Sequence, residues 1–183
     1  MKERVIRELK RIEQEYGVRV LLAVESGSRA WGFASPDSDY DVRFIYAHPK
    51  DWYISVMEER DVIEEMLPGD LDVSGWDLRK ALRLFAKCNL ALNEWIGSPM
   101  TYFAIDEFRA QIAALIPRYF NPIAAIHHYR STAATAFRDN YGRRQEVPLR
   151  VEPRGIIEPF GWLMTELDEN WANPGLGARL RGR

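Results

Sequence analysis

Two aspartates, Asp39 and Asp41, follow a Gly27–Ser28 pair after ten intervening residues. Carboxylate oxygens are ligands that Mg²⁺ and Mn²⁺ prefer, and Mg²⁺ commonly joins one or two protein carboxylates to substrate phosphates. Glycine permits close approach of the backbone to a phosphate, and a serine hydroxyl donates hydrogen bonds to phosphate oxygens. The pattern indicates metal-assisted phosphoryl or nucleotidyl transfer, with the aspartates at the metal and Gly27–Ser28 at the phosphates.

Such sites usually include a third carboxylate, and Asp70 and Asp72 are both candidates. Asp72 falls within a short apolar segment, 71–74, which predicts a strand beside the first two aspartates. Asp70 directly follows a Pro-Gly pair that is typical of turns. We therefore favour Asp72 as the third carboxylate, sharing a metal ion or acting on the attacking hydroxyl, and Asp77 is the next candidate.

These groups need strands and a turn to bring them together. The apolar segment 19–24 predicts a buried strand that ends at a turn containing Gly27, and residues 28–34 predict a short helix or tight turn. Backbone N–H groups at the start of such a helix bind anions. A second strand is predicted over about 40–46, and alternation of side chains places Asp39 and Asp41 on one face.

The rest of the chain predicts the helices and strands that surround the site. Apolar residues at three- and four-residue spacing predict a helix over 2–16 that stops at Gly17. Weaker strand candidates are 52–57 and 61–66, and helices are expected over 76–85 and about 90–97, 104–116 and 120–140. Strands thus precede helices, which predicts an α+β fold with a small mixed β-sheet and a helical C-terminal half.

Three regions follow from this layout. Residues 1–100 form the predicted core and 101–147 a helical extension. Residues 148–183 are rich in proline and glycine and predict an irregular tail, within which only 160–171 fits an apolar helix.

Composition narrows the class of protein. Apolar residues make up 46% and charged residues 28%, which excludes wholesale disorder. The net charge of −2 excludes a strongly basic polyanion binder, and the single cysteine, Cys88, excludes an internal disulfide. No apolar run approaches the roughly 20 residues that cross a bilayer, and the N-terminal stretch lacks the apolar segment of a secretory signal. We expect a cytoplasmic protein with no membrane partner.

The residues at the predicted site resemble a known signature. Residues 27–32 (GSRAWG), followed by 38–41 (SDYD), resemble the signature of the DNA polymerase β superfamily of nucleotidyltransferases. Residues 75–82 (GWDLRKAL), with 93–95 (NEW) and 98–99 (SP), are similar to one branch of it, the RlaP family, which is associated with RNA ligases in RNA repair. The resemblance covers about residues 1–147.

The resemblance implies a small mixed-sheet nucleotidyltransferase domain that transfers a nucleotidyl group from a nucleoside triphosphate such as ATP. It implies that Asp39 and Asp41 bind Mg²⁺ or Mn²⁺ and that Asp72 acts on the acceptor hydroxyl. Gly27 and Ser28 would hold phosphates, with Arg29 from the same motif. Lys80 follows Asp72 closely enough in sequence to reach a triphosphate, as does Arg79, although a solvated helix face is the alternative for both.

Three functions remain open from the sequence. The first is transfer of a nucleoside monophosphate to an RNA end, a protein side chain or a small molecule, with RNA ends and an RNA ligase as expected partners. The second is an antitoxin-type nucleotidyltransferase that modifies a partner protein. The third is a catalytically inactive nucleotide-binding module, against which the presence of all three carboxylates argues.

Overall fold

A computed structural model describes residues 1–57 and 59–141 of the chain. The predicted irregular tail at 148–183, including the helix proposed for 160–171, and the last residues of the helical extension lie outside the described residues. The residues up to Asn140 form one compact unit. In chain order the elements are α1 (Lys2–Tyr16), β1 (Arg19–Glu25), β2 (Tyr40–Ala47), α2 (Lys50–Ile54), β3 (Val62–Leu67), β4 (Leu71–Asp77), α3 (Leu78–Ala86), α4 (Leu90–Gly97), β5 (Thr101–Ala104), α5 (Asp106–Tyr119) and α6 (Pro122–Tyr141).

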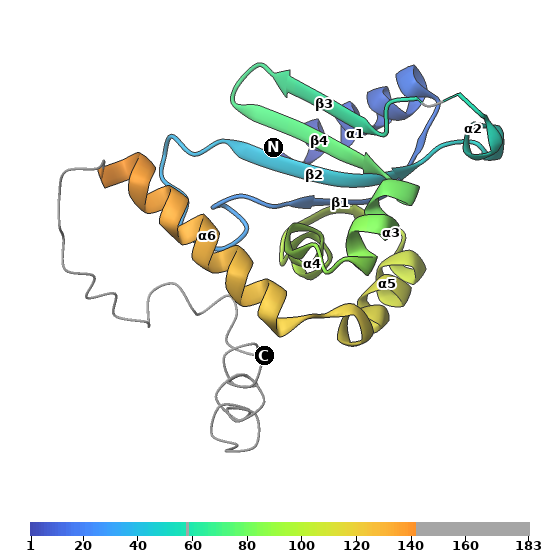
Figure 1. Ribbon diagram of the computed structural model, residues 1–183. Helices are drawn as coiled ribbons and strands as arrows, with labels where there is room; N and C mark the ends of the chain where they lie inside the picture. Colours follow the sequence, from blue (N-terminus) through green and yellow to red (C-terminus); the bar gives the residue numbers. More distant parts are fainter. Residues whose placement is uncertain (58, 142–183) are drawn as a thin grey trace, which may run out of the picture. The chain divides into compact units, whose positions relative to one another are not determined.

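Within the described part of the chain, the strands form a mixed five-stranded sheet in the order β3-β4-β2-β1-β5. Figure 1 shows β3, β4, β2 and β1 side by side in this order. β2 and β4 are parallel, whereas β1–β2, β1–β5 and β3–β4 are antiparallel pairs. The predicted α+β fold with a small mixed sheet is therefore confirmed. The parallel pair has a consequence for the site, because the first residues of β2 and β4 lie at the same end of the sheet.

Two hydrophobic layers cover the two faces of the sheet. On one face, Val5 and Leu9 of α1 pack against Val42 and Phe44 of β2. On the other face, Ile45 of β2 packs in a cluster with residues of α3, α4 and α5: Ala81, Phe85, Leu92, Trp95 and Ile112. Because side chains alternate along a strand, Asp41 and Arg43 point to the same face as Ile45.

Several sequence predictions are confirmed with small changes of bounds. α1 covers 2–16, and Gly17 ends it in the left-handed conformation, with φ of 62°, as expected for a glycine stop. The strand predicted at 61–66 is β3, and the predicted helix at 76–85 begins at Leu78 because β4 continues to Asp77.

The strand predicted at 52–57 is wrong, because residues 50–54 form the short helix α2. The Trp-Tyr-Ile composition favours a strand by propensity. In the structure, Pro49 accepts a hydrogen bond from the Trp52 N–H at 3.1 Å, and Trp52 stacks on His48 with ring centroids 4.1 Å apart. Packing of the aromatic rings thus overrides the local preference.

The sequence also missed a strand. Residues 101–104, assigned to the helical extension, form β5, which pairs with β1 at the edge of the sheet. The sheet therefore continues past the boundary predicted at residue 100. Four residues are too few to show a clear alternation, so the pairing with β1 defines this strand.

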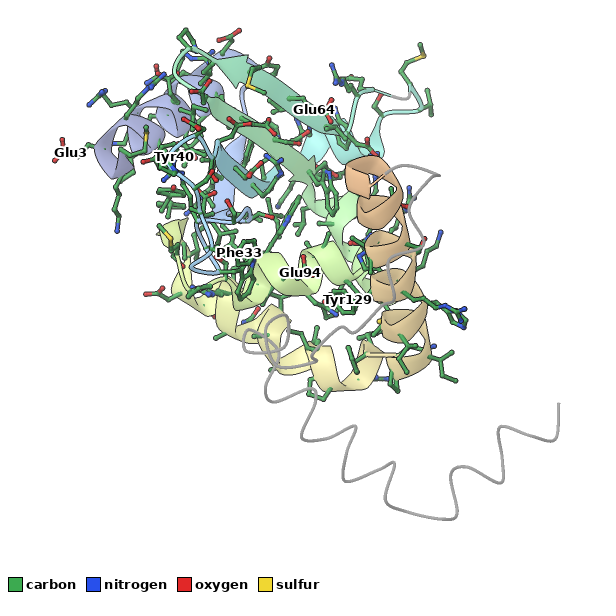
Figure 2. All side chains as sticks on the ribbon, turned by 90° about the vertical axis from the view of Figure 1, so that its left-hand side faces the viewer. Glu3, Phe33, Tyr40, Glu64, Glu94 and Tyr129 are labelled. Carbon is green, nitrogen blue, oxygen red and sulfur yellow. The ribbon has the colours of Figure 1, made fainter. Side chains whose placement is uncertain are left out.

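A hydrogen bond joins the last described helix, α6, to α4. Tyr129 of α6 donates a hydrogen bond to Glu94 of α4 at 2.9 Å, and Figure 2 shows the two side chains near one another. Within residues 1–57 and 59–141, none of the helices combines the length and apolar character that crossing a membrane requires.

Candidate active site

Asp41 and Asp72 are direct neighbours across the parallel β2–β4 pair. Neighbouring strands lie about 4.8 Å apart, and residues in register point to the same face. The two side chains are partly exposed, at 31% and 29%, so solvent and a ligand can reach them. The structure thus brings two of the three predicted carboxylates together at the first residues of both strands.

Asp70, the alternative to Asp72, lies in the β3–β4 turn with a left-handed φ of 56°. Its backbone carbonyl accepts a hydrogen bond from the Tyr40 N–H at 2.8 Å, and its side chain is exposed. This placement agrees with the choice of Asp72 over Asp70, while the catalytic role of Asp72 stays a prediction.

Asp39 is not part of this pair. It precedes β2, which begins at Tyr40, so strand alternation does not fix the direction of its side chain. Asp39 is exposed, and its backbone carbonyl accepts a hydrogen bond from Arg29 at 3.1 Å. Among the described residues, no three His, Cys, Asp or Glu side chains form a group that could hold a metal ion. The carboxylates that the structure gathers are therefore Asp41 and Asp72.

Gly27 lies against the carboxylate of Asp41. A Cβ atom built on Gly27 would lie 1.9 Å from Oδ2 of Asp41. The φ of Gly27 is outside the left-handed region, so contact with Asp41, and not backbone conformation, requires glycine here. The Gly-Ser turn and the aspartate strand are thus in direct contact, as a shared binding site needs.

The turn after Gly27 offers free backbone donors. Ala30 N–H donates to the carbonyl of Gly27 at 3.0 Å, and Phe33 N–H donates to that of Ser28 at 3.2 Å. Within the described part of the chain, the N–H groups of residues 27–29 have no acceptor. Residues 28–34 were predicted to form a short helix or a tight turn, and they form turns over 28–32. The N–H groups of residues 27–29 remain available to an anion.

Replacing Gly27 with alanine is expected to weaken Mg·ATP binding by about tenfold or more, because the new methyl group displaces the Asp41 carboxylate. Isothermal titration calorimetry measures the affinity, and far-UV circular dichroism checks the fold. Gly97→Ala is the matched control, because a Cβ atom there meets nothing within 4 Å. A folded Gly27→Ala protein that binds Mg·ATP as the wild type does would contradict this prediction.

Arg29 fastens the turn to the start of β2. Its guanidinium donates to the carbonyls of Ser38 at 2.5 Å and Asp39 at 3.1 Å. It also lies over the ring of Tyr40, 4.0 Å from the centroid. The guanidinium that was predicted to meet phosphate is therefore engaged in positioning the loop that carries Asp39.

Lys80 lies far from the carboxylate pair. It is on α3, which follows the last residue of β4, at the end of the strand opposite to Asp72 (Figure 1). Asp77 lies five residue steps along the strand from Asp72, a distance of about 16 Å. Lys80 forms an ion pair with Asp61 at 2.9 Å. The structure does not bring Lys80 together with the predicted metal ligands.

Asp77 and Arg79 lie, like Lys80, at the end of β4 that is distant from Asp72. Asp77 is fully buried and caps α3, accepting hydrogen bonds from Arg79 N–H at 2.8 Å and from the hydroxyl of Tyr53 at 2.7 Å. The guanidinium of Arg79 lies over the ring of Trp52. Asp77 therefore has a structural role at the helix start, and Arg79 packs on aromatic rings there.

Glu25, which was not predicted from the sequence, positions the backbone of Asp41 from the neighbouring strand β1. Glu25 is fully buried at the end of β1, where its Oε1 accepts the backbone N–H of Asp41 at 2.8 Å. Its Oε2 accepts the hydroxyl of Tyr102 at 2.6 Å. Burial, together with this hydrogen bond, raises the pKa of Tyr102, so the phenol stays a donor. The available signal was an acid that directly precedes the Ser-Gly-Ser turn.

Arg43 was missed as well. It follows Asp41 by two residues on the same face of β2, and one nitrogen, Nη2, donates to both Asp41 at 3.1 Å and Asp72 at 2.7 Å. Alternation along the predicted strand could have placed Arg43 beside Asp41. Its position between the two carboxylates required the parallel pairing of β2 with β4.

The chain is similar to the polymerase β class of nucleotidyltransferases. Residues 1–151 match the family described as the RNA repair pathway DNA polymerase beta family, RlaP, and the chain belongs to that family. The resemblance seen in the motifs is therefore confirmed. Membership indicates a nucleotidyltransferase role in RNA repair.

A relative extends this similarity over most of the chain. The sequence is 48% identical, over an alignment 183 residues long, to the uncharacterized protein YcgL of Bacillus subtilis strain 168. The alignment covers 91% of this chain and 70% of the relative.

Proposed function

We propose that the protein transfers a nucleoside monophosphate from a nucleoside triphosphate to an acceptor hydroxyl, with Mg²⁺ or Mn²⁺ and release of pyrophosphate. The observation that carries this proposal is the Asp41–Asp72 pair in register, in contact with the Gly27 turn. The carboxylates supply hard oxygen ligands, and the free N–H groups of the turn supply donors for phosphate.

The residues present fit a divalent metal ion. Asp41 and Asp72 are partly exposed carboxylates on one sheet face, and Gly27 lets the turn lie directly against Asp41, where a methyl group would clash with the carboxylate. They would hold the metal, and we propose Asp39 from the adjoining loop as a further oxygen ligand. The metal, when bound, would neutralise charge that develops on the phosphates.

The chain's own groups would handle the nucleotide and the proton. The N–H groups of residues 27–29 and the hydroxyl of Ser28 would hold phosphate oxygens. The acceptor oxygen attacks the α-phosphorus, the bond to the β-phosphate oxygen breaks, and pyrophosphate leaves. Asp72 would accept the proton of the acceptor hydroxyl as a general base.

We propose the hydroxyl of an RNA end as the acceptor, with an RNA ligase as the partner enzyme. The description of the family as an RNA repair pathway family supports this choice over a protein acceptor. The modest net charge of −2 means that RNA binding would depend on local donors and not on a basic surface.

The test is transfer of label from each of the four nucleoside triphosphates, labelled at the α- or the γ-phosphate, in the presence of Mg²⁺. We expect RNA with free hydroxyl ends to gain α-label and no γ-label, with one pyrophosphate released for each transfer. Label on added protein in place of RNA would favour an antitoxin-type activity. Absence of both transfer and nucleotide binding would reject the proposal in favour of an inactive module.

A further inference from the structure

Arg43 occupies the position between the two carboxylates proposed to hold metal. Its Nη2 atom donates to Oδ1 of Asp41 and to Oδ2 of Asp72. Within the described residues, its other contacts are longer, from Nη1 to the backbone carbonyls of Val42 at 3.3 Å and Asp72 at 3.4 Å. The side chain therefore interacts mainly through one nitrogen and two carboxylate oxygens.

The geometry makes this interaction displaceable. A guanidinium binds a single carboxylate most strongly when two parallel N–H groups meet its two oxygens, whereas here one nitrogen is shared between two carboxylates. The Arg43 side chain is 21% exposed, so solvent weakens both ion pairs. A small divalent cation carries twice the charge and uses the same oxygens.

We propose that Arg43 competes with the divalent metal for Asp41 and Asp72, so that metal binds tightly only when nucleotide phosphates add their own ligands. This inference rests on the proposed metal-dependent function. Without the arginine, two carboxylates in register would repel each other and attract a divalent ion by themselves. Arg43 thus couples metal binding to the arrival of the nucleotide at the same site.

Titration of the full chain with Mn²⁺ in the absence of nucleotide, followed by electron paramagnetic resonance, tests the inference. Arg43→Gln should bind Mn²⁺ about 10- to 100-fold more tightly than the wild type, because a competing positive charge is gone. Arg43→Lys, which keeps the charge, should stay within about threefold of the wild type. Arg11→Gln removes an arginine that pairs with Glu8, Glu15 and Glu65, and should leave Mn²⁺ affinity unchanged.

A second measurement follows the Arg43 side chain directly in the wild-type protein. In protein labelled with ¹⁵N-arginine, the Arg43 Nε–H signal, assigned with Arg43→Lys, should shift as Mg²⁺ and a non-hydrolysable ATP analogue are added together. The Arg11 signal should stay in place. A bound metal with an unmoved Arg43 signal would overturn the inference.

The outcomes separate the inference from the function on which it rests. In one outcome, Mn²⁺ binding depends on Asp41 while the Arg43→Gln variant binds Mn²⁺ no more tightly than the wild type does. In that case Arg43 orients the carboxylates, and the proposed competition with the metal is wrong. If neither protein binds Mn²⁺ in a way that Asp41→Asn abolishes, with or without nucleotide, the proposed metal site fails and the inference fails with it.

Discussion

Replacing Asp41 with asparagine is expected to lower the rate of nucleotidyl transfer by about 10³-fold or more, since charge stabilisation by a bound metal supplies several kcal/mol to such reactions. The substitution is nearly isosteric and removes the charge that faces Arg43 and Asp72. The Asp41 side chain is 31% exposed, so the lost ion pair should cost at most about 1 kcal/mol of folding stability. Label transfer, calorimetry with Mg·ATP and thermal unfolding measure the three quantities.

Asp37→Asn is the matched control for this variant. Asp37 is an exposed acid in the loop before β2, and its replacement should change neither transfer nor Mg·ATP affinity. Asp39→Asn should also weaken Mg·ATP binding if Asp39 supplies the further oxygen ligand that we propose. Full activity in Asp41→Asn would show that the carboxylate pair is not the reaction centre.

Replacing Asp72 with asparagine should slow transfer by about 10²- to 10⁴-fold, the range expected for loss of a general base. Mg·ATP affinity should stay within a few fold of the wild type, because Asp41, Asp39 and the nucleotide phosphates still supply oxygen ligands to the metal. The lost base acts mainly in the chemical step. The asparagine amide oxygen still accepts a hydrogen bond from Arg43, so the sheet register should survive. Single-turnover kinetics and calorimetry separate the two effects.

Asp70→Asn provides a closely matched comparison on the same hairpin. Asparagine tolerates the left-handed φ of 56° found at Asp70, and the hydrogen bond from Tyr40 uses only the backbone carbonyl. This variant should therefore retain both transfer and binding. Inactive Asp70→Asn beside active Asp72→Asn would show that the third carboxylate is Asp70.

The sequence by itself determined the local elements that build the site. Spacing of Val5, Leu9 and Ile12 predicted α1, and the left-handed conformation of Gly17 explains where it ends. The apolar run of β1 and the turn signals around Gly27 predicted the strand and turn that carry the glycine. These features depend on periodicity and turn chemistry, which neighbouring residues specify.

The sequence also identified the superfamily, through the Gly-Ser and Asp-x-Asp motifs, and the RlaP family, through residues 75–82, 93–95 and 98–99. The sequence also favoured Asp72 over Asp70 as a hypothesis. The pleat of a strand fixes the direction of a side chain, whereas a turn does not. The placement of Asp72 opposite Asp41 agrees with that choice.

Only the tertiary structure decided which side chains meet. The parallel pairing of β2 with β4 places Arg43 between Asp41 and Asp72, and it carries Lys80 to the opposite end of the sheet. Strand β5 brings Tyr102 to the buried carboxylate of Glu25. The physical reason is that strand pairing joins residues distant in the chain, and no local propensity or spacing encodes which strands become neighbours or in what register.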